Sequence, residues 1–179
     1  MNFTPLPVAG AFAVTIERQA DARGSFARAY DERAFAARGL NTRWPQHNFS
    51  FSRRGGTLRG LHWQADPHGE VKLVRCTRGS AHDVVVDLRA DSPSYLQHAC
   101  VEMSVANGVA VYIPLGCAHG VQSLEDDTEL HYLMGAEFVP AAFRGLRWDD
   151  PALGIRWPIV PPTLSERDAA LPVLDSAVA

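Results

Sequence analysis

The feature that most constrains the fold is a series of short apolar runs, rich in β-branched residues and separated by glycine and proline, between Ala11 and about Phe138. Runs of about four to eight residues with such punctuation are typical of the strands of an antiparallel sandwich or barrel, and helical periodicity is scarce. The expected strands span residues 11–17, 46–52, 57–64, 71–78, 81–89, 108–114 and 129–134. The sequence therefore predicts an all-β fold.

Two short helices are predicted beside these strands. Residues 31–39 form the first, because Asp31 can cap its first amides and Gly39 can adopt the left-handed conformation that closes a helix. The second follows a proline-rich stretch near the end of the chain, and its cap is Thr163 or Ser165. Both helices are expected to be peripheral.

No repeat or low-complexity tract divides the chain, and 179 residues are enough to bury a sizeable core without disulfide or metal staples. We therefore expect one domain over residues 1–179. Its barrel is expected at about 10–140, with an extended tail and short helix at 141–179.

Composition narrows the class of protein. A net charge of −3 gives no general attraction to nucleic acid or to an anionic membrane, and 46% hydrophobic residues is typical of a globular protein. Cys76, Cys100 and Cys117 are widely spaced and form no CxxC pair, so we interpret them as reduced thiols of the core. The N-terminal residues lack a basic leader and no apolar run is long enough to span a bilayer, which predicts a cytoplasmic protein.

The segment GVAVYIPLGCAHG, residues 108–120, has the spacing of a strand, a tight turn at Gly116 and a return strand that carries His119. This spacing resembles the second motif of the cupin superfamily, which are small antiparallel jelly-roll barrels. Metal-binding cupins also use an HxH pair, and here Trp63 and Gln64 follow His62. A metal site of His62, Glu70 and His119 is therefore disfavoured, and no metal is expected.

A more specific resemblance joins nine segments in the same order along the chain. These are RGSF (23–26), QHNFS (46–50), GTLRGLHWQ (56–64), VKLVRC (71–76), DVVVDLRADSPSY (83–95), IPLGCAHG (113–120), HY (131–132), WDDPALGIRWP (148–158) and LSERD (164–168). They resemble the dTDP-4-dehydrorhamnose 3,5-epimerases. The resemblance implies a cupin-like antiparallel jelly roll that epimerises carbons beside the keto group of a nucleotide-linked 4-keto-6-deoxyhexose, with no cofactor.

That chemistry needs a base, a group that stabilises an enolate, and an acid on the opposite face of the sugar. By resemblance His62 is the base, and Asp168 orients its ring. Lys72 stabilises the charge on the C4 oxygen, and Tyr132 is the acid. Asp149 and Asp150 are alternatives to Asp168, because the path of the tail cannot be read from the sequence.

The resemblance also implies substrate contacts and a partner. Strand alternation places Arg59 and His62 on opposite faces, so both serve one pocket only if Gly60 permits a bulge. Members of the family are homodimers, in which Arg23 and Phe26 would reach the partner's pocket. The complete set of expected substrate-binding residues is Arg23, Phe26, Gln46, Asn48, Arg59, His119 and Phe138.

Three positions depart from the family pattern. Arg28 and Phe143 stand where glutamates near the nucleotide are usual, which favours a different base, a different phosphate arrangement or stacking. Phe138 stands where a tyrosine is usual, which makes an epimerase that acts on a single carbon an option beside one that acts on both. A sugar-nucleotide 3,4-ketoisomerase, a binding barrel without turnover and a metal-dependent cupin remain as alternatives.

Overall fold

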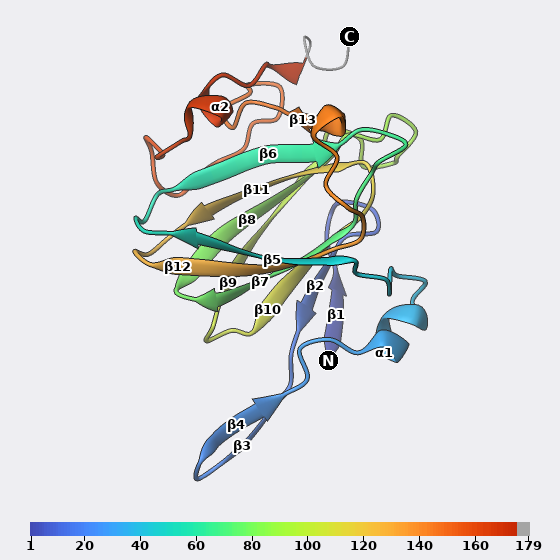
Figure 1. Ribbon diagram of the computed structural model, residues 1–179, viewed down its shortest axis with the longest axis vertical. Helices are drawn as coiled ribbons and strands as arrows, with labels where there is room; N and C mark the ends of the chain where they lie inside the picture. The colour runs from blue at the N-terminus through green and yellow to red at the C-terminus, as the bar shows by residue number, and fades with distance from the viewer. Residues whose placement is uncertain (175–179) are drawn as a thin grey trace.

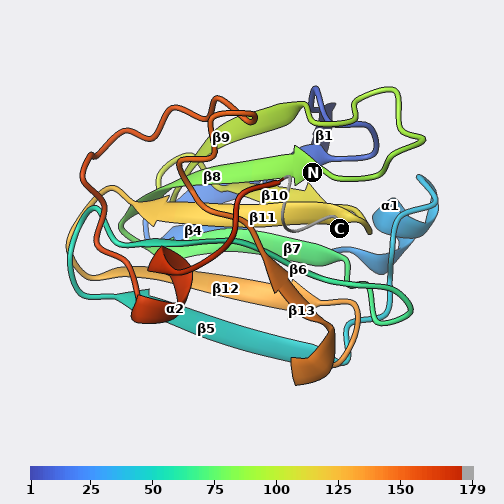
Figure 2. The same ribbon diagram turned by 90° about the horizontal axis from the view of Figure 1, so that it is seen from above.

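The computed structural model describes residues 1–174, in which two antiparallel sheets face each other as a jelly roll (Figures 1 and 2). The larger sheet has the order β1 (Asn2–Pro5), β2 (Phe12–Thr15), β10 (Val109–Ile113), β7 (Lys72–Arg78), β12 (Thr128–Met134) and β5 (Gln46–Ser52). The smaller sheet has the order β13 (Phe143–Gly145), β6 (Leu58–Gln64), β11 (Cys117–Ser123), β8 (Ser80–Asp87) and β9 (His98–Ser104). The predicted all-β fold is confirmed.

Among residues 1–174, three short helices and one hairpin lie outside these two sheets. The helices are α1 (Glu32–Ala36), the 3₁₀ helix η1 (Pro140–Ala142) and α2 (Glu166–Ala169). The hairpin of β3 (Arg18–Asp21) and β4 (Gly24–Ala27) projects away from the two sheets at the bottom of Figure 1. In the described part of the chain, no helix is long and apolar enough to cross a membrane.

All seven predicted strands are present, and both helix predictions are confirmed. Asp31 caps α1 by accepting a hydrogen bond from the Ala34 amide at 3.0 Å. Ser165, and not Thr163, caps α2, because its hydroxyl accepts a hydrogen bond from the Asp168 amide. The sequence did not indicate β1, β3, β4, β9 or β13, which are short strands or lie at sheet edges.

The main core lies between the two sheets and contains, among others, Val85 of β8 and Val111 of β10. A second cluster on the outer face of the smaller sheet joins Val84 and Val86 to residues of the tail such as Trp157. Because the tail covers that face, β8 is buried on both sides, which explains its unbroken valine run. The outer face of the larger sheet is covered in part by Phe35 of α1.

The cysteines only partly fit the prediction of core thiols. All three are free; Cys76 and Cys117 are buried, as expected. The prediction is wrong for Cys100, which is exposed. This residue lies on β9, an edge strand whose side chains alternate between the core and solvent.

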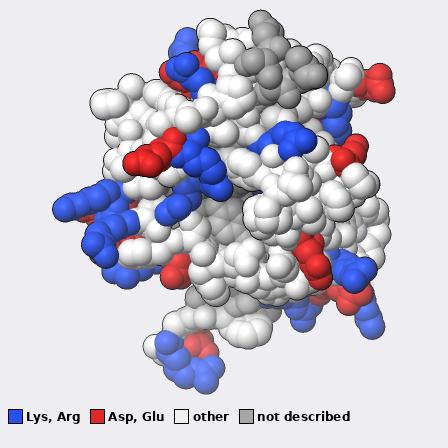
Figure 3. Space-filling model, turned by 45° about the horizontal axis from the view of Figure 1, so that its top comes forward, with Lys and Arg blue, Asp and Glu red and all other residues white. Residues whose placement is uncertain are grey.

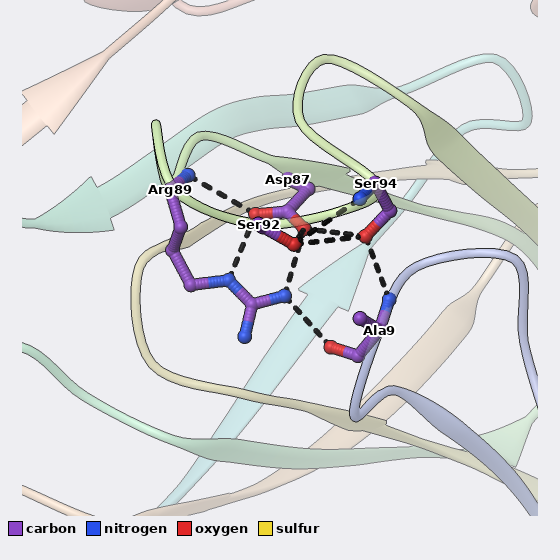
Figure 4. Close-up of polar contacts among 5 residues, drawn as sticks. All are labelled: Ala9, Asp87, Arg89, Ser92 and Ser94. Atoms are coloured by element: carbon purple, nitrogen blue, oxygen red, sulfur yellow. Dashed lines mark hydrogen bonds and ion pairs between the residues drawn. The ribbon is translucent and has the colours of Figure 1, made fainter.

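A buried carboxylate ties the loop after β8 to the N-terminal segment (Figure 4). The fully buried Asp87 accepts hydrogen bonds from the Arg89 guanidinium at 2.8 Å and from the Ser94 hydroxyl at 2.6 Å. Ser92 donates to the same carboxylate, and Arg89 also donates to the Ala9 carbonyl at 2.7 Å. Burial alone raises the pKa of Asp87, but the bonds from Arg89, Ser92 and Ser94 outweigh it and hold the pKa well below its ordinary value.

This carboxylate makes the stability of the protein depend on pH. Because the pKa of Asp87 is lower in the folded protein than the value of about 3.9 expected when unfolded, its contribution is present above about pH 4 and is lost as the pH falls further. We expect Asp87→Asn to lower the free energy of unfolding by about 3 kcal/mol at pH 7 and by a smaller amount at pH 3, because part of the contribution is lost between about pH 4 and pH 3. Urea denaturation at both pH values measures this, with the exposed Asp91→Asn as control. An equal loss at both pH values would contradict it.

Candidate active site

A bulge in β6 brings two predicted site residues to one side of the strand. Arg59 pairs with Val121 of β11, and His62 pairs with His119, so three steps along β6 match two along β11. Gly60 lies between them at φ +140°, and a Cβ there would come within 2.5 Å of the Gly120 Cα. The extra residue reverses the alternation after Gly60, so that Arg59 and His62 both line one cleft.

His62 faces a buried carboxylate that α2 carries. Its Nε2 lies 2.9 Å from Asp168 Oδ1, and only 3% of Asp168 is exposed. The alternatives serve elsewhere: Asp149 pairs with Arg147, and the buried Asp150 accepts from the Leu174 amide. Of the three candidates for this partner, the structure therefore places Asp168 against the imidazole.

The surroundings of His62 favour a neutral ring. Burial lowers the pKa of His62, and the hydrogen bond that the ring donates to Asp168 only partly opposes this effect. Because an ionised carboxylate can only accept, Nε2 carries the ring hydrogen and Nδ1 keeps the lone pair. The ring is therefore set up to take a proton.

Lys72 is held in the cleft by a buried ion pair. Its Nζ lies 3.1 Å from Glu70 Oε1 and 3.4 Å from the carbonyl oxygen of His62. The side chains of Lys72 and Glu70 are both more than nine-tenths buried. The other carboxylate oxygen of Glu70 accepts a hydrogen bond from Gln64 Nε2 at 3.2 Å. The Gln64 side chain also bonds the backbone of Glu137 and Val139. The ammonium group is thus fixed by a carboxylate that is itself anchored.

Removing that carboxylate is expected to destabilise the protein more than removing the pair. Glu70→Gln leaves a buried cation unpaired, so we expect the free energy of unfolding to fall by about 3 kcal/mol. Adding Lys72→Met to Glu70→Gln should restore most of this loss. Chemical denaturation of both variants measures the effect, with the exposed Glu102→Gln as control. Equal stability of the single and double variants would contradict it.

Tyr132 forms another wall of the cleft. Burial raises the pKa of its phenol above the ordinary value, and the charge of Asp83 adds to this effect. The phenol therefore keeps its proton at neutral pH. The ring centroid of Tyr132 lies 6.0 Å from that of His119, whose Nε2 is 2.6 Å from Asp83 Oδ2. His119 is thus a second histidine held by an aspartate; unlike His62 it is buried, and it lines the same cleft.

The cleft has a volume of about 550 Å³, which is within the usual range for a site that binds a small molecule. Seven of the eleven predicted site residues line it: Asn48, Arg59, His62, Lys72, His119, Tyr132 and Asp168. Three cationic side chains, Arg59, Lys72 and Arg167, border it. Lys and Arg side chains also gather on the left of the face in Figure 3. This local positive charge, on a chain of net charge −3, suits an anionic ligand.

The other four predicted residues lie outside the lining of this cleft. Arg23 and Phe26 belong to the projecting hairpin, where Arg23 pairs with Asp21 at 2.7 Å and Phe26 is 73% exposed. Gln46 binds the backbone: its Oε1 accepts a hydrogen bond from the Phe138 amide at 3.1 Å. The Phe138 side chain is 53% exposed.

Sequence reasoning missed five residues that line the cleft: Phe49, Ser50, Met134, Ser165 and Arg167. Strand alternation was a usable signal for two of them, since Ser50 and Met134 lie two positions after Asn48 and Tyr132. Arg167 directly precedes Asp168 in LSERD. Its role as a wall of the cleft depends on the turn of α2, which the sequence does not locate.

The titratable side chains that line the cleft suit proton transfer better than metal binding. Within residues 1–174, no three His, Cys, Asp or Glu side chains lie close enough together to hold a metal ion. The Glu70 carboxylate of the disfavoured metal triad is paired with Lys72. The arrangement instead joins a neutral imidazole, an ammonium and a protonated phenol around one space.

Known proteins share this fold and length. A family model described as dTDP-4-dehydrorhamnose 3,5-epimerase matches residues 5–176. The dTDP-4-dehydrorhamnose 3,5-epimerase of Sinorhizobium fredii is 40% identical over 175 residues, which are 97% of this chain and 90% of the relative.

Solved structures agree. The dTDP-4-dehydrorhamnose 3,5-epimerase of Elizabethkingia anophelis matches with a TM-score of 0.95 and 32% identity, over 98% of this chain and 97% of that one. A 3′-monoepimerase from Streptomyces bikiniensis, solved in complex with dTDP-quinovose, matches with a TM-score of 0.90 and 36% identity, over 97% of this chain and 88% of that one. With its cupin-like jelly roll and a match over nearly its whole length, the chain belongs to the dTDP-4-dehydrorhamnose 3,5-epimerase family of isomerases.

Proposed function

We propose that this protein inverts C3, C5 or both in a nucleotide-linked 4-keto-6-deoxyhexose. The observation that carries the proposal is one cleft lined by the His62–Asp168 pair, Lys72 and Tyr132. A ketone at C4 makes the hydrogens on both neighbouring carbons acidic, so the reaction needs the three kinds of group that the cleft contains.

In the proposed reaction, Nδ1 of His62 takes the hydrogen from C3 or C5 as a proton. The electron pair of the broken C–H bond moves to the C4 oxygen, and the Lys72 ammonium stabilises the resulting enolate through a hydrogen bond. The Tyr132 hydroxyl then gives its proton to the same carbon from the opposite face, and the carbonyl re-forms. Asp168 stabilises the imidazolium, and exchange with water returns a proton to Tyr132 and removes one from His62. No redox step or cofactor takes part.

The diphosphate of a nucleotide-linked sugar is negatively charged, so cationic side chains are expected to bind it. Arg59 and Arg167 border the cleft and suit a diphosphate, because a guanidinium binds phosphate oxygens through two parallel hydrogen bonds. The neighbours solved with dTDP ligands support a nucleotide-diphosphate sugar as the substrate class. Arg28 pairs with Asp31 outside the cleft, and Phe143 packs on His62, so neither offers the carboxylate that is usual in the family. These two positions favour a base or phosphate contact that differs from the thymidine type.

We also propose that the protein is a cytoplasmic homodimer whose sites are completed by the partner. The exposed Phe26 on the projecting hairpin, and the exposed Phe49 and Phe51 on β5, supply apolar surface for a second copy. In such a dimer, Arg23 and Phe26 would serve the partner's cleft.

The test incubates the protein with dTDP-, CDP-, GDP- and UDP-linked 4-keto-6-deoxyhexoses in deuterium oxide. The position of the label is read by NMR, and the configuration of the product is determined. Deuterium at C3, C5 or both with inversion supports the epimerase. Migration of the ketone from C4 to C3 would support the ketoisomerase instead, and exchange with none of the four sugars would contradict both.

A further inference from the structure

Phe143 lies at the end of the site where α2 meets β6. It begins β13, which pairs with β6 so that Phe143 faces Gln64 and Gly145 faces His62. Its ring centroid lies 5.1 Å from that of His62, at an interplanar angle of 54°. The guanidinium carbon of Arg167 lies over the same ring, 4.6 Å from its centroid. One aromatic ring thus contacts both the proposed base and a cation.

The cation beside this ring also approaches the carboxylate that holds His62. Asp168 Oδ1 lies 2.9 Å from His62 Nε2 and 3.4 Å from Arg167 Nε. Asp168 Oδ2 accepts a hydrogen bond from the Gly60 amide at 3.4 Å. His62 and Arg167 therefore compete for the same oxygen of the buried Asp168 carboxylate. Each of these three side chains and Phe143 contacts two of the others, so the contacts form a closed circuit.

Without the aromatic ring, little would hold Arg167 there. Its side chain is 61% exposed, and its 3.4 Å contact with Asp168 is long for a charge-assisted hydrogen bond. A long exposed side chain loses much conformational freedom when it is fixed in one geometry. The face of the Phe143 ring attracts the guanidinium that lies over it, and this attraction favours the observed arrangement.

We propose that Phe143 is a positioning residue: its ring holds the Arg167 guanidinium beside Asp168, so that Arg167 and His62 share one carboxylate oxygen. The catalytic meaning of this sharing rests on the proposed function, in which His62 is the base. Because the Arg167 guanidinium partly neutralises the charge of Asp168, the carboxylate stabilises the His62 imidazolium less than it would without Arg167. The neutral ring that must take the proton is therefore favoured.

The other charged and titratable groups around His62 also bear on its protonation. Lys72 on β7 places a cation near the His62 carbonyl, and its effect adds to that of Arg167. Glu70 is paired with Lys72, and His119 of β11 is paired with Asp83. Tyr132 of β12, on the far wall, stays protonated because burial raises the pKa of its phenol. Arg167 differs from these groups because an aromatic side chain, Phe143, holds it in place, and that side chain can be changed by mutation.

The test follows the titration of His62 by NMR in ligand-free protein labelled at the histidine ring carbons, with His62→Asn used to assign the signal. We expect Phe143→Leu and Arg167→Gln each to raise the titration midpoint of His62 by about half a pH unit. The double variant should show no further rise, since Phe143 acts through Arg167. Phe143→Tyr, which keeps an aromatic face, should leave the midpoint unchanged.

Two outcomes would overturn the proposal. One is an unchanged midpoint in Phe143→Leu. The other is a rise of the same size when Phe143→Leu is added to Arg167→Gln, because the ring would then act by shielding His62 from water. This measurement needs no turnover, so it is separable from the proposed function. If a sugar is turned over, the acid limb of the pH profile of kcat/KM should move with the NMR midpoint.

Discussion

Replacing His62 with asparagine is expected to lower kcat for epimerisation by about 10³-fold, because a positioned general base contributes about 10²–10⁴-fold to such a reaction. The substitution removes the ring nitrogen that would take the proton and keeps a side chain of similar size and polarity. Incorporation of deuterium from solvent should fall by the same factor as product formation, since both require the same broken C–H bond. NMR of the sugar in deuterium oxide measures the two rates together.

The companion variant Asp168→Asn should have a smaller effect, of about 10²-fold on kcat. It keeps the imidazole but removes the negative charge that lies 2.9 Å from Nε2 and stabilises the imidazolium. His68→Asn is the matched control, because His68 is exposed and lies outside the cleft. Deuterium exchange at the wild-type rate in His62→Asn would show that another group removes the proton.

The sequence was sufficient where a local pattern determines the structure. The valine run of β8 and the cap of α1 each follow from residues close together in the chain. The positions of β6 and β12 were predictable for the same reason, and with them those of His62 and Tyr132. Family motifs then grouped residues that are distant in sequence, such as His62 and Asp168, which the structure places 2.9 Å apart.

The remaining features depend on long-range packing. The sequence raised the conflict between Arg59 and His62, but the bulge that resolves it arises from the close approach of Gly60 to Gly120 on another strand. The same limit applies to Arg167, because its place beside Phe143 requires the proline-rich tail to cross the sheet and return α2 to β6. The projecting hairpin consists of two exposed strands of four residues each, which carry no hydrophobic alternation by which they could be predicted.

Replacing Tyr132 with phenylalanine is expected to separate the two halves of the reaction. His62 and Lys72 remain, so removal of the proton and formation of the enolate should continue. The proton that completes inversion is missing, because the phenol that keeps its hydrogen at neutral pH is gone. We expect formation of the inverted product to fall by about 10²–10³-fold, while deuterium exchange falls much less.

The retained exchange has a specific stereochemical consequence. After His62 has taken the proton, its imidazolium exchanges with deuterium oxide and returns deuterium to the same face, so the sugar is labelled without a change of configuration. Tyr95→Phe is the control, since Tyr95 is 40% exposed and lies in the loop after β8. Inverted product at the wild-type rate in Tyr132→Phe would assign the acid to another group, and His119, whose ring centroid lies 6.0 Å from that of Tyr132, is a candidate. Equal loss of exchange and inversion would instead mean that the phenol acts before the enolate forms, as a donor to the C4 oxygen beside Lys72.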